Sequence, residues 1–243
     1  MTRTEEGFER LAPPRKGEWR SLFPEKEQTF EHYVALRPNR ASRARGAFVL
    51  QPLGDVARRS AAALDRMREY AAAFFGLDAR LAPPIPIFGA AHVGPRDQYN
   101  SSMILGDLAE RAPADALVYL GVTDQDLFAR GKKFVFGEGS LEGRAGVCSL
   151  ARLEGSDRRA LKLMTHEAGH LLSIAHCATH RCVMQGSNTL EESDGHPFHL
   201  CPEDLRKLEW STGVDRAERY RKLRSFYLKM KWGAEAHWIE KWT

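Results

Sequence analysis

The sequence has no long apolar run, only four cysteines and little excess of either charge among its 243 residues. No stretch approaches the roughly 20 apolar residues that a membrane-spanning helix needs, so we expect no membrane association. The first 20 residues are charged throughout and lack the apolar segment of a secretory signal, which predicts a cytoplasmic protein. In that reducing environment the cysteines are expected to bind metal or to be buried as thiols, because disulfides are rare there.

Charge is also nearly balanced, with 36 Lys and Arg against 32 Asp and Glu and a net charge of +4. This excess is too small to indicate a polyanionic partner, so we expect no binding to nucleic acid. Residues 215–231 carry seven basic side chains, but apolar residues recur between them at helical spacing. The segment is therefore predicted to be a helix with a solvated basic face.

The order of the expected elements places a sheet in the first part of the chain and helices in the second. The pattern predicts strands at residues 47–50, 116–122, 133–136 and 145–150, and helices at 55–75 and 101–112. After residue 158 only helices and loops are expected. Alternation of strands and helices favours an α/β sheet whose first strands are parallel.

Residues 1–45 are the least patterned part, since prolines interrupt a mixture of charges there. We predict an irregular N-terminal extension that lies on a single domain of residues 46–243. Four aromatic residues are expected to anchor it: Phe8, Trp19, Phe23 and Phe30. A structural role is favoured over a binding role for this extension.

The sequence HEAGHLLSIAH at residues 166–176 carries the clearest chemical signal. On a helix His166 and His170 share one face, so both imidazoles can bind one ion beside the carboxylate of Glu167. His176 is too far along to bind from the same straight helix, so the helix must turn sharply before it. The pattern predicts a catalytic zinc held by His166, His170 and His176, with Glu167 as the general base toward a zinc-activated water.

The region around this motif resembles the archaemetzincins, a branch of the metzincin zinc peptidases, over roughly residues 98–230. The resemblance is carried by residues 122–124, 126–128, 134–138 and 146–152, and then by His166 to Cys177, Cys182, Met184, 187–188, 191–192, Pro197, 200–202 and Leu205. It implies a zinc metallopeptidase that acts on peptide or protein substrates. An aminopeptidase-like activity on short peptides is the finer expectation that the family suggests.

The resemblance also implies a fold of the α+β or α/β class, the metzincin-like zincin fold. This fold has a twisted mixed sheet with an antiparallel edge strand, an active-site helix and a helical C-terminal part. The upper part would comprise residues 46–175 and the lower part residues 176–243. By position, residues 145–150 would form the edge strand, which can hold a peptide by main-chain pairing. Met184 would lie in a turn beneath the catalytic zinc without binding it.

Ser173 departs from the family pattern, because archaemetzincins have glycine at this position, where the active-site helix ends in a left-handed conformation. A residue with a side chain adopts that conformation at a cost of about 1 kcal/mol. We therefore expect a strained or reshaped turn that still lets the three histidines converge.

A second zinc, structural in role and held by four cysteines, is implied by the same resemblance. Cys177, Cys182 and Cys201 match three of the positions, and Asp204 stands at the fourth. We expect zinc held by these four residues, since three thiolates and a carboxylate can form a tetrahedral site. Two alternatives stay open: completion of the site by His180 or His199, and a packed thiol cluster without metal.

The alternative function is a zinc-stabilised protein that binds peptides without cleaving them, which the departures at Ser173 and Asp204 would support. Glu167 favours hydrolysis, because a carboxylate at that position serves the water and not the metal. Cys148 lies in an apolar strand and is expected to be a small core residue.

Overall fold

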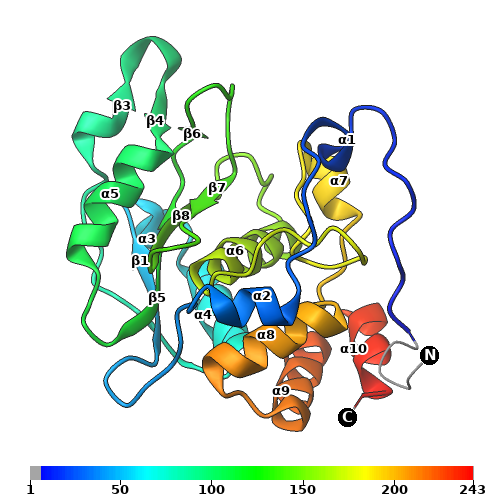
Figure 1. The fold of residues 1–243 in the computed structure, drawn as a ribbon. Helices are drawn as coiled ribbons and strands as arrows, with labels where there is room; N and C mark the ends of the chain where they lie inside the picture. The colour runs from blue at the N-terminus through cyan, green and yellow to red at the C-terminus, as the bar shows by residue number, and fades with distance from the viewer. Residues whose placement is uncertain (1–6, 243) are drawn as a thin grey trace.

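A five-stranded mixed sheet lies at the centre of the computed structural model, which describes residues 7–242 (Figure 1). Its strands are β1 (Ala47–Pro52), β2 (Asp78–Leu81), β5 (Ala116–Thr123), β7 (Gly137–Gly139) and β8 (Ala145–Ser149). In space they follow the order β2-β1-β5-β8-β7. All neighbours are parallel except β7, which pairs antiparallel with β8 at the edge. The mixed sheet with an antiparallel edge strand is therefore confirmed.

Helices cover both faces of this sheet. α4 (Ala61–Phe75) and α6 (Asp157–Leu171) pack on one face, and α5 (Ser101–Arg111) packs on the other. Residues of β1 and β5 are buried along their whole length, which explains why these strands read as apolar runs without alternation. The side chain of Ser156 caps α6 by accepting a hydrogen bond from the Arg159 amide, so the helix that carries His166 and His170 has a defined start.

A smaller sheet extends the upper end of the molecule in Figure 1. It consists of β3 (His92–Val93), β4 (Gln98–Asn100) and β6 (Leu127–Phe128), with the 3₁₀ turns η1 (Gly89–Ala91) and η2 (Gly94–Arg96) beside β3. The Asn100 side chain accepts a hydrogen bond from the Met103 amide and caps α5, so β4 leads directly into that helix.

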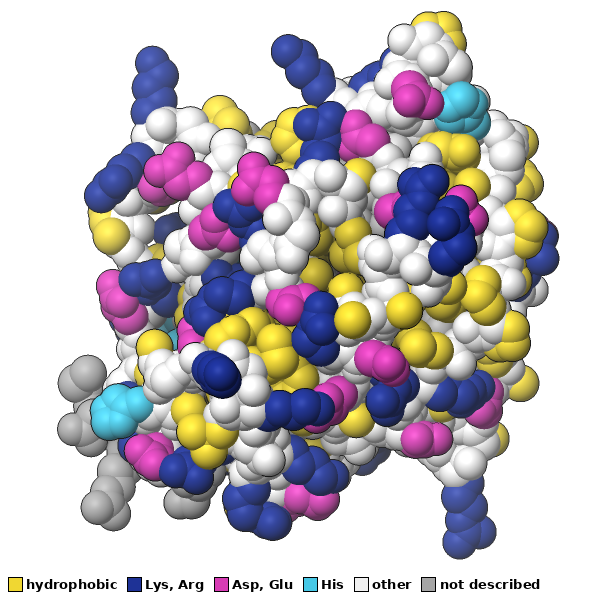
Figure 2. Space-filling view, turned by 180° about the vertical axis from the view of Figure 1, so that it is seen from behind, with side chains coloured by type: hydrophobic (Ala, Val, Ile, Leu, Met, Phe, Trp, Pro, Cys, Tyr) yellow, Lys and Arg dark blue, Asp and Glu magenta, His cyan; other side chains and the backbone are white. Residues whose placement is uncertain are grey.

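The second part of the chain is helical, as predicted. It forms α7 (Leu190–Asp194), α8 (Pro202–Thr212), α9 (Arg216–Lys229) and α10 (Gly233–Glu240). α9 buries Tyr220, Leu223, Phe226 and Tyr227 in the core and leaves most of its basic side chains outside, as its helical pattern indicates. On the back of the molecule, basic and acidic side chains are interleaved (Figure 2). Residues 7–242 contain no helix whose length and hydropathy would together allow it to span a membrane.

The N-terminal segment, residues 7–45, contains the short helices α1 (Trp19–Leu22) and α2 (Phe30–Ala35). α1 lies beside α7, and α2 lies on α8 (Figure 1). Tyr33 of α2 is fully buried, and its hydroxyl donates a hydrogen bond to the Leu172 carbonyl just beyond α6. The segment is thus packed against the same region of the chain that carries the histidine motif.

Three details of the predicted elements were wrong. The helix expected at residues 55–75 is divided into α3 (Val56–Arg59) and α4, because Ser60 leaves the helical conformation at φ −131° and ψ 31°. The strand expected at residues 133–136 is only a single bridge from Val135 to Leu127. β8, at residues 145–149, is not the edge strand but lies between β5 and β7, where its fully buried apolar residues fit an interior position.

Candidate active site

The three histidines of the motif converge on one point. His166 and His170 project from the last turns of α6, and His176 reaches them from the loop that follows. His166 Nε2 lies 3.1 Å from His170 Nε2 and 3.2 Å from His176 Nε2. Three ring nitrogens packed this closely form a donor set for one metal ion.

The opposite ring nitrogens show which tautomer each histidine adopts. His166 Nδ1 lies 3.0 Å from the Val183 carbonyl oxygen, His170 Nδ1 lies 2.8 Å from the Ile174 carbonyl oxygen, and His176 Nδ1 lies 2.7 Å from a Glu25 carboxylate oxygen. Because these oxygens can only accept, each Nδ1 carries the proton and each Nε2 presents a lone pair. The arrangement fits a divalent cation such as zinc.

Burial also keeps His166 and His170 neutral, which is the form that binds metal. It lowers the pKa of His166 well below the usual range, with a further contribution from His170. It lowers the pKa of His170 to about 4, with a further contribution from His176. Protonation would place like charges side by side in a poorly hydrated site, so both imidazoles stay neutral and can bind a cation.

The turn between the second and third histidines contains the left-handed residue that the sequence predicted. Ser173 has φ 63°, and its hydroxyl donates a 2.7 Å hydrogen bond to the Leu141 carbonyl. α6 ends at Leu171, and this conformation redirects the chain so that His176 points back to the helix. A serine at this position is therefore compatible with convergence of the three rings.

Glu167 lies beside the histidines and is 6% exposed. Its side chain packs against the edge strand β7, where a Cβ at Gly137 would lie 2.7 Å from a Glu167 carboxylate oxygen. Gly139 is equally constrained, since a Cβ there would lie 2.7 Å from the Glu167 backbone oxygen. Burial, and secondarily the charge of Glu138, raises the pKa of Glu167 to about 8. The two glycines thus allow the edge strand to approach a buried carboxyl group.

A cleft of about 280 Å³ opens over the histidines and Glu167. β7 forms one wall, and the loop before α7 forms the other, with contributions from Gln185, Ser187 and Asn188. Trp19 of the N-terminal segment and Lys132 also line it, and the Lys132 ammonium lies 4.5 Å from the centre of the Trp19 ring. The cleft can therefore hold an extended segment along the edge strand.

Met184 is fully buried, and its side chain packs against α6 at Gly169. A Cβ at Gly169, which lies between His166 and His170 in the sequence of α6, would collide with the Met184 side chain. Its carbonyl accepts a hydrogen bond from the Cys177 amide, so the methionine turn is also tied to the chain that follows the third histidine.

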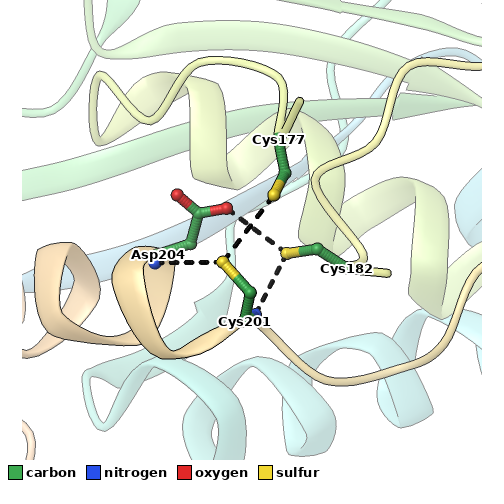
Figure 3. Close-up of side chains that lie close together, drawn as sticks. All are labelled: Cys177, Cys182, Cys201 and Asp204. Carbon is green, nitrogen blue, oxygen red and sulfur yellow. Dashed lines mark hydrogen bonds between the residues drawn. The ribbon is translucent and has the colours of Figure 1, made fainter. Parts of the chain in front are cut away.

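Cys177, Cys182, Cys201 and Asp204 form a second cluster, in which all four potential ligand atoms lie within 4.8 Å of one another (Figure 3). The Cys177 and Cys201 sulfurs are 3.7 Å apart, and Cys182 Sγ is 3.3 Å from an Asp204 oxygen. Hydrogen bonding with Cys182 and Cys201 lowers the pKa of Cys177, which favours its thiolate. The cluster is a suitable donor set for zinc.

Lys207 compensates part of the negative charge that such a cluster would carry. Its buried ammonium lies 2.8 Å from Asp204 Oδ1, while Asp204 Oδ2 faces the sulfurs. Burial, and secondarily the Cys177 thiolate, raises the pKa of Asp204 to about 6.

His180 and His199, the alternative fourth ligands, lie outside the cluster. His180 is buried and contacts Thr179. His199 stacks on Trp238 with ring centres 3.9 Å apart. Cys148 is fully buried in β8, as expected of a core residue.

Sequence reasoning missed the contribution of the N-terminal segment. It named Trp19 only as an apolar anchor and gave no role to Glu25 or Gln28. No local pattern could have found these residues, because they reach a site about 150 positions further along the chain.

The comparisons with known proteins place this site in a family context. A model of Peptidase family M54 matches residues 98–210, which include the complete histidine motif and all four residues of the cysteine cluster. Archaemetzincin-2 of Rattus norvegicus is 31% identical over an alignment 264 positions long, which covers 89% of this chain and 74% of that protein. Archaemetzincin of Methanocaldococcus jannaschii is 35% identical over an alignment 171 positions long, which covers 66% of this chain and 91% of that protein.

Two solved structures share the fold. The crystal structure of archaemetzincin from Methanopyrus kandleri superimposes with a TM-score of 0.63 at 26% identity, covering 72% of this chain and 99% of that one. That of archaemetzincin from Archaeoglobus fulgidus gives a TM-score of 0.57 at 31% identity, covering 66% and 99%. About a third of this chain therefore has no counterpart in the smaller archaeal structures.

Proposed function

We propose that this chain, which belongs to the archaemetzincin family of zinc metallopeptidases, hydrolyses peptide bonds at the histidine cluster. His166, His170 and His176 hold the catalytic zinc, and Glu167 is the general base. The proposal is carried by one observation, the convergence of three Nε2 lone pairs beside a buried carboxylate at the floor of a cleft.

Zinc at this position supplies Lewis acidity, which polarises the scissile carbonyl group and acidifies water in the site. A Glu167 carboxylate oxygen takes a proton from the attacking water and delivers it to the nitrogen of the leaving amine. Burial raises the pKa of this carboxyl, whereas a cation nearby lowers it. These opposing effects favour a pKa at which Glu167 can both accept and release a proton.

The substrate binds as an extended peptide along β7. This strand pairs with β8 on one side, and its other side lines the cleft, so its backbone groups can pair with a peptide. A cleft of about 280 Å³ is at the small end of the range for ligand sites, which favours short peptides. Aminopeptidase-like cleavage is the finer form of the proposal.

Met184 serves as the apolar floor under the catalytic zinc. The cysteine cluster holds a second zinc through Cys177, Cys182, Cys201 and Asp204. That site is structural, because its ligand atoms are buried and leave no position open for a substrate.

Replacement of Glu167 by Gln tests the mechanism. Hydrolysis of fluorogenic peptides should fall about a hundredfold or more, because the amide cannot accept the proton from water. Zinc content should be unchanged, because Glu167 is not a ligand. Glu110→Gln, at an exposed position on α5, is the matched control and should leave the rate unchanged.

The same assay separates the finer activities. Faster cleavage of peptides with a free amino terminus than of blocked ones would support an aminopeptidase. A wild-type protein that carries zinc and binds peptides but hydrolyses none of them would support the alternative function, a peptide-binding protein. A Glu167→Gln variant with the wild-type rate would overturn the proposed general base.

A further inference from the structure

The N-terminal segment reaches the histidine cluster although it lies outside the matched residues 98–210. A Glu25 carboxylate oxygen, Oε1, lies 2.7 Å from His176 Nδ1. The other oxygen, Oε2, accepts a 3.2 Å hydrogen bond from the Trp19 indole. The Trp19 ring also packs edge-on against the His176 ring, with centres 5.2 Å apart. Two residues of one segment therefore contact the third histidine directly.

His176 differs from the other two histidines in the group that accepts a hydrogen bond from its Nδ1. His166 and His170 donate to backbone carbonyls close to the motif, whereas His176 donates to a side chain 151 positions earlier. A carboxylate that accepts a hydrogen bond from Nδ1 fixes the orientation of the ring. It also makes Nε2 a more basic ligand for a metal. His176 is also the one histidine of the three that lies in a loop, so its orientation depends most on such a partner.

Gln28 acts on the loop that leads to His176. Its amide nitrogen donates a 2.9 Å hydrogen bond to the Ser173 carbonyl, and its amide oxygen accepts a 3.1 Å bond from the Ala175 backbone. Gln28 is buried, with 9% of its surface exposed. One side chain thus satisfies two backbone polar groups of the turn in which Ser173 adopts its left-handed conformation.

The segment is itself fixed at several points around the site. The Trp19 amide donates a 2.8 Å hydrogen bond to Glu192 of α7, and a Cβ at Gly186 would collide with the Trp19 ring. The Phe30 amide donates to Glu203 of α8, and the Tyr33 hydroxyl donates to the Leu172 carbonyl. Glu25 and Gln28 therefore lie between anchored points, so their side chains are held in place.

We infer, on the basis of the proposed function, that Glu25 and Gln28 are positioning residues of the catalytic metal centre. Glu25 acts through the His176 ring, and Gln28 acts through the turn from Ser173 to Ala175. The N-terminal segment is thus part of the zinc site, although it supplies no ligand.

The role of Glu25 is tested by the affinity of the protein for the more weakly bound zinc. This affinity is measured on the full chain by competition with a chromophoric chelator at constant pH. Glu25→Ala should weaken binding by about tenfold to a hundredfold, the range typical of such outer partners. Glu25→Gln should weaken it less, because the amide oxygen can still accept the hydrogen bond without carrying charge. Glu27→Ala, at an exposed position on the same segment, is the matched control and should leave affinity unchanged.

A coupled experiment tests Gln28. Gln28→Ala should also weaken zinc binding. The loss of affinity should be smaller in a Ser173→Gly background, because glycine adopts φ 63° without the hydrogen bonds from Gln28. A generally damaged fold would show the same loss in both backgrounds. Absorption spectra of cobalt-loaded protein should also change in Glu25→Gln, since the geometry of the histidine shell is altered.

The outcomes separate this inference from the proposed function. Wild-type zinc affinity and cobalt spectra in both Glu25 variants would overturn the role of Glu25 while leaving the three-histidine site intact. An equal effect of Gln28→Ala in both backgrounds would overturn the role of Gln28. A His176→Ala variant that retains zinc as tightly as the wild type would overturn the proposed function itself, and the inference with it.

Discussion

Ser173 shows how one residue balances two opposing contributions. Its φ of 63° is unfavourable for a residue with a Cβ, by about 1–2 kcal/mol. Its hydroxyl bond to the Leu141 carbonyl contributes about 0.5–1.5 kcal/mol in return. The side chain that strains the turn therefore also stabilises it.

We predict that Ser173→Ala and Ser173→Gly have different effects on stability. Alanine keeps the strain and loses the hydrogen bond, so it should lower the free energy of unfolding by about 1 kcal/mol. Glycine loses the bond but relieves the strain, so its effect should be close to zero. Urea unfolding of zinc-loaded protein measures both values, and a glycine variant that is less stable than the alanine variant would show that φ at this position is not a source of strain.

Single residues also show the limit of local sequence patterns at this site. The convergence of His166, His170 and His176 could be predicted, because it follows from their spacing on a helix and from the short turn after it. Glu25 could not, because its contact with His176 depends on how two distant segments pack. Lys207 could not be predicted for the same reason, because its charge compensates that of Asp204 only when the cluster assembles.

The helices and strands with a clear apolar pattern could be predicted from the sequence. Those whose position depends on pairing or packing with neighbouring elements could not. β5 and α5 lie where their apolar patterns place them. β7 has three residues with glycine at both ends and no apolar pattern, so its role as the edge strand arises from pairing with β8 and packing against Glu167. The interior position of β8 is likewise a property of the sheet, which no strand pattern reports.

α8 begins at the cysteine cluster. Cys201 is the N-cap of α8, and its sulfur accepts from the Asp204 amide, so the cluster joins the start of this helix to the loop after α6. A Cys177→Ser and Cys182→Ser double variant should bind one zinc per chain instead of two, because hydroxyl groups are poor zinc ligands. It should also unfold at a lower temperature.

Elemental analysis of protein purified without added metal measures this stoichiometry. Cys148→Ser is the control, since that thiol is buried in β8 away from the cluster, and it should retain both zincs. Two zincs in the double variant, or one in the wild type, would contradict a zinc held by this cluster.

At the scale of the whole molecule, the two clusters lie on the same stretch of chain but in different surroundings. The histidines line an open cleft, whereas the ligand atoms of the second cluster are enclosed between the loop after α6 and the start of α8. The N-terminal segment spans this region, since residues 9–11 pair with residues 179–181 and Asn39 donates to the Leu171 carbonyl. The histidine cluster thus lines an accessible cleft, while the cysteine cluster is buried among packed side chains.

This difference predicts two steps when metal is removed. A chelator should first strip zinc from the open histidine site, which abolishes hydrolysis but changes the melting temperature little, because α6 keeps its packing in the core. Removal of the enclosed zinc should follow more slowly and should lower the melting temperature by about 10 °C or more. That size is expected because a structural zinc contributes several kcal/mol to the free energy of unfolding, and each kcal/mol shifts the melting temperature by about 2–4 °C in a chain of this length.

Activity, released zinc and thermal unfolding, followed together during chelator titration, measure both steps. Release of both ions in one step would show that the sites are coupled, and loss of all zinc without a change in melting temperature would show that the cysteine cluster does not stabilise the fold through metal.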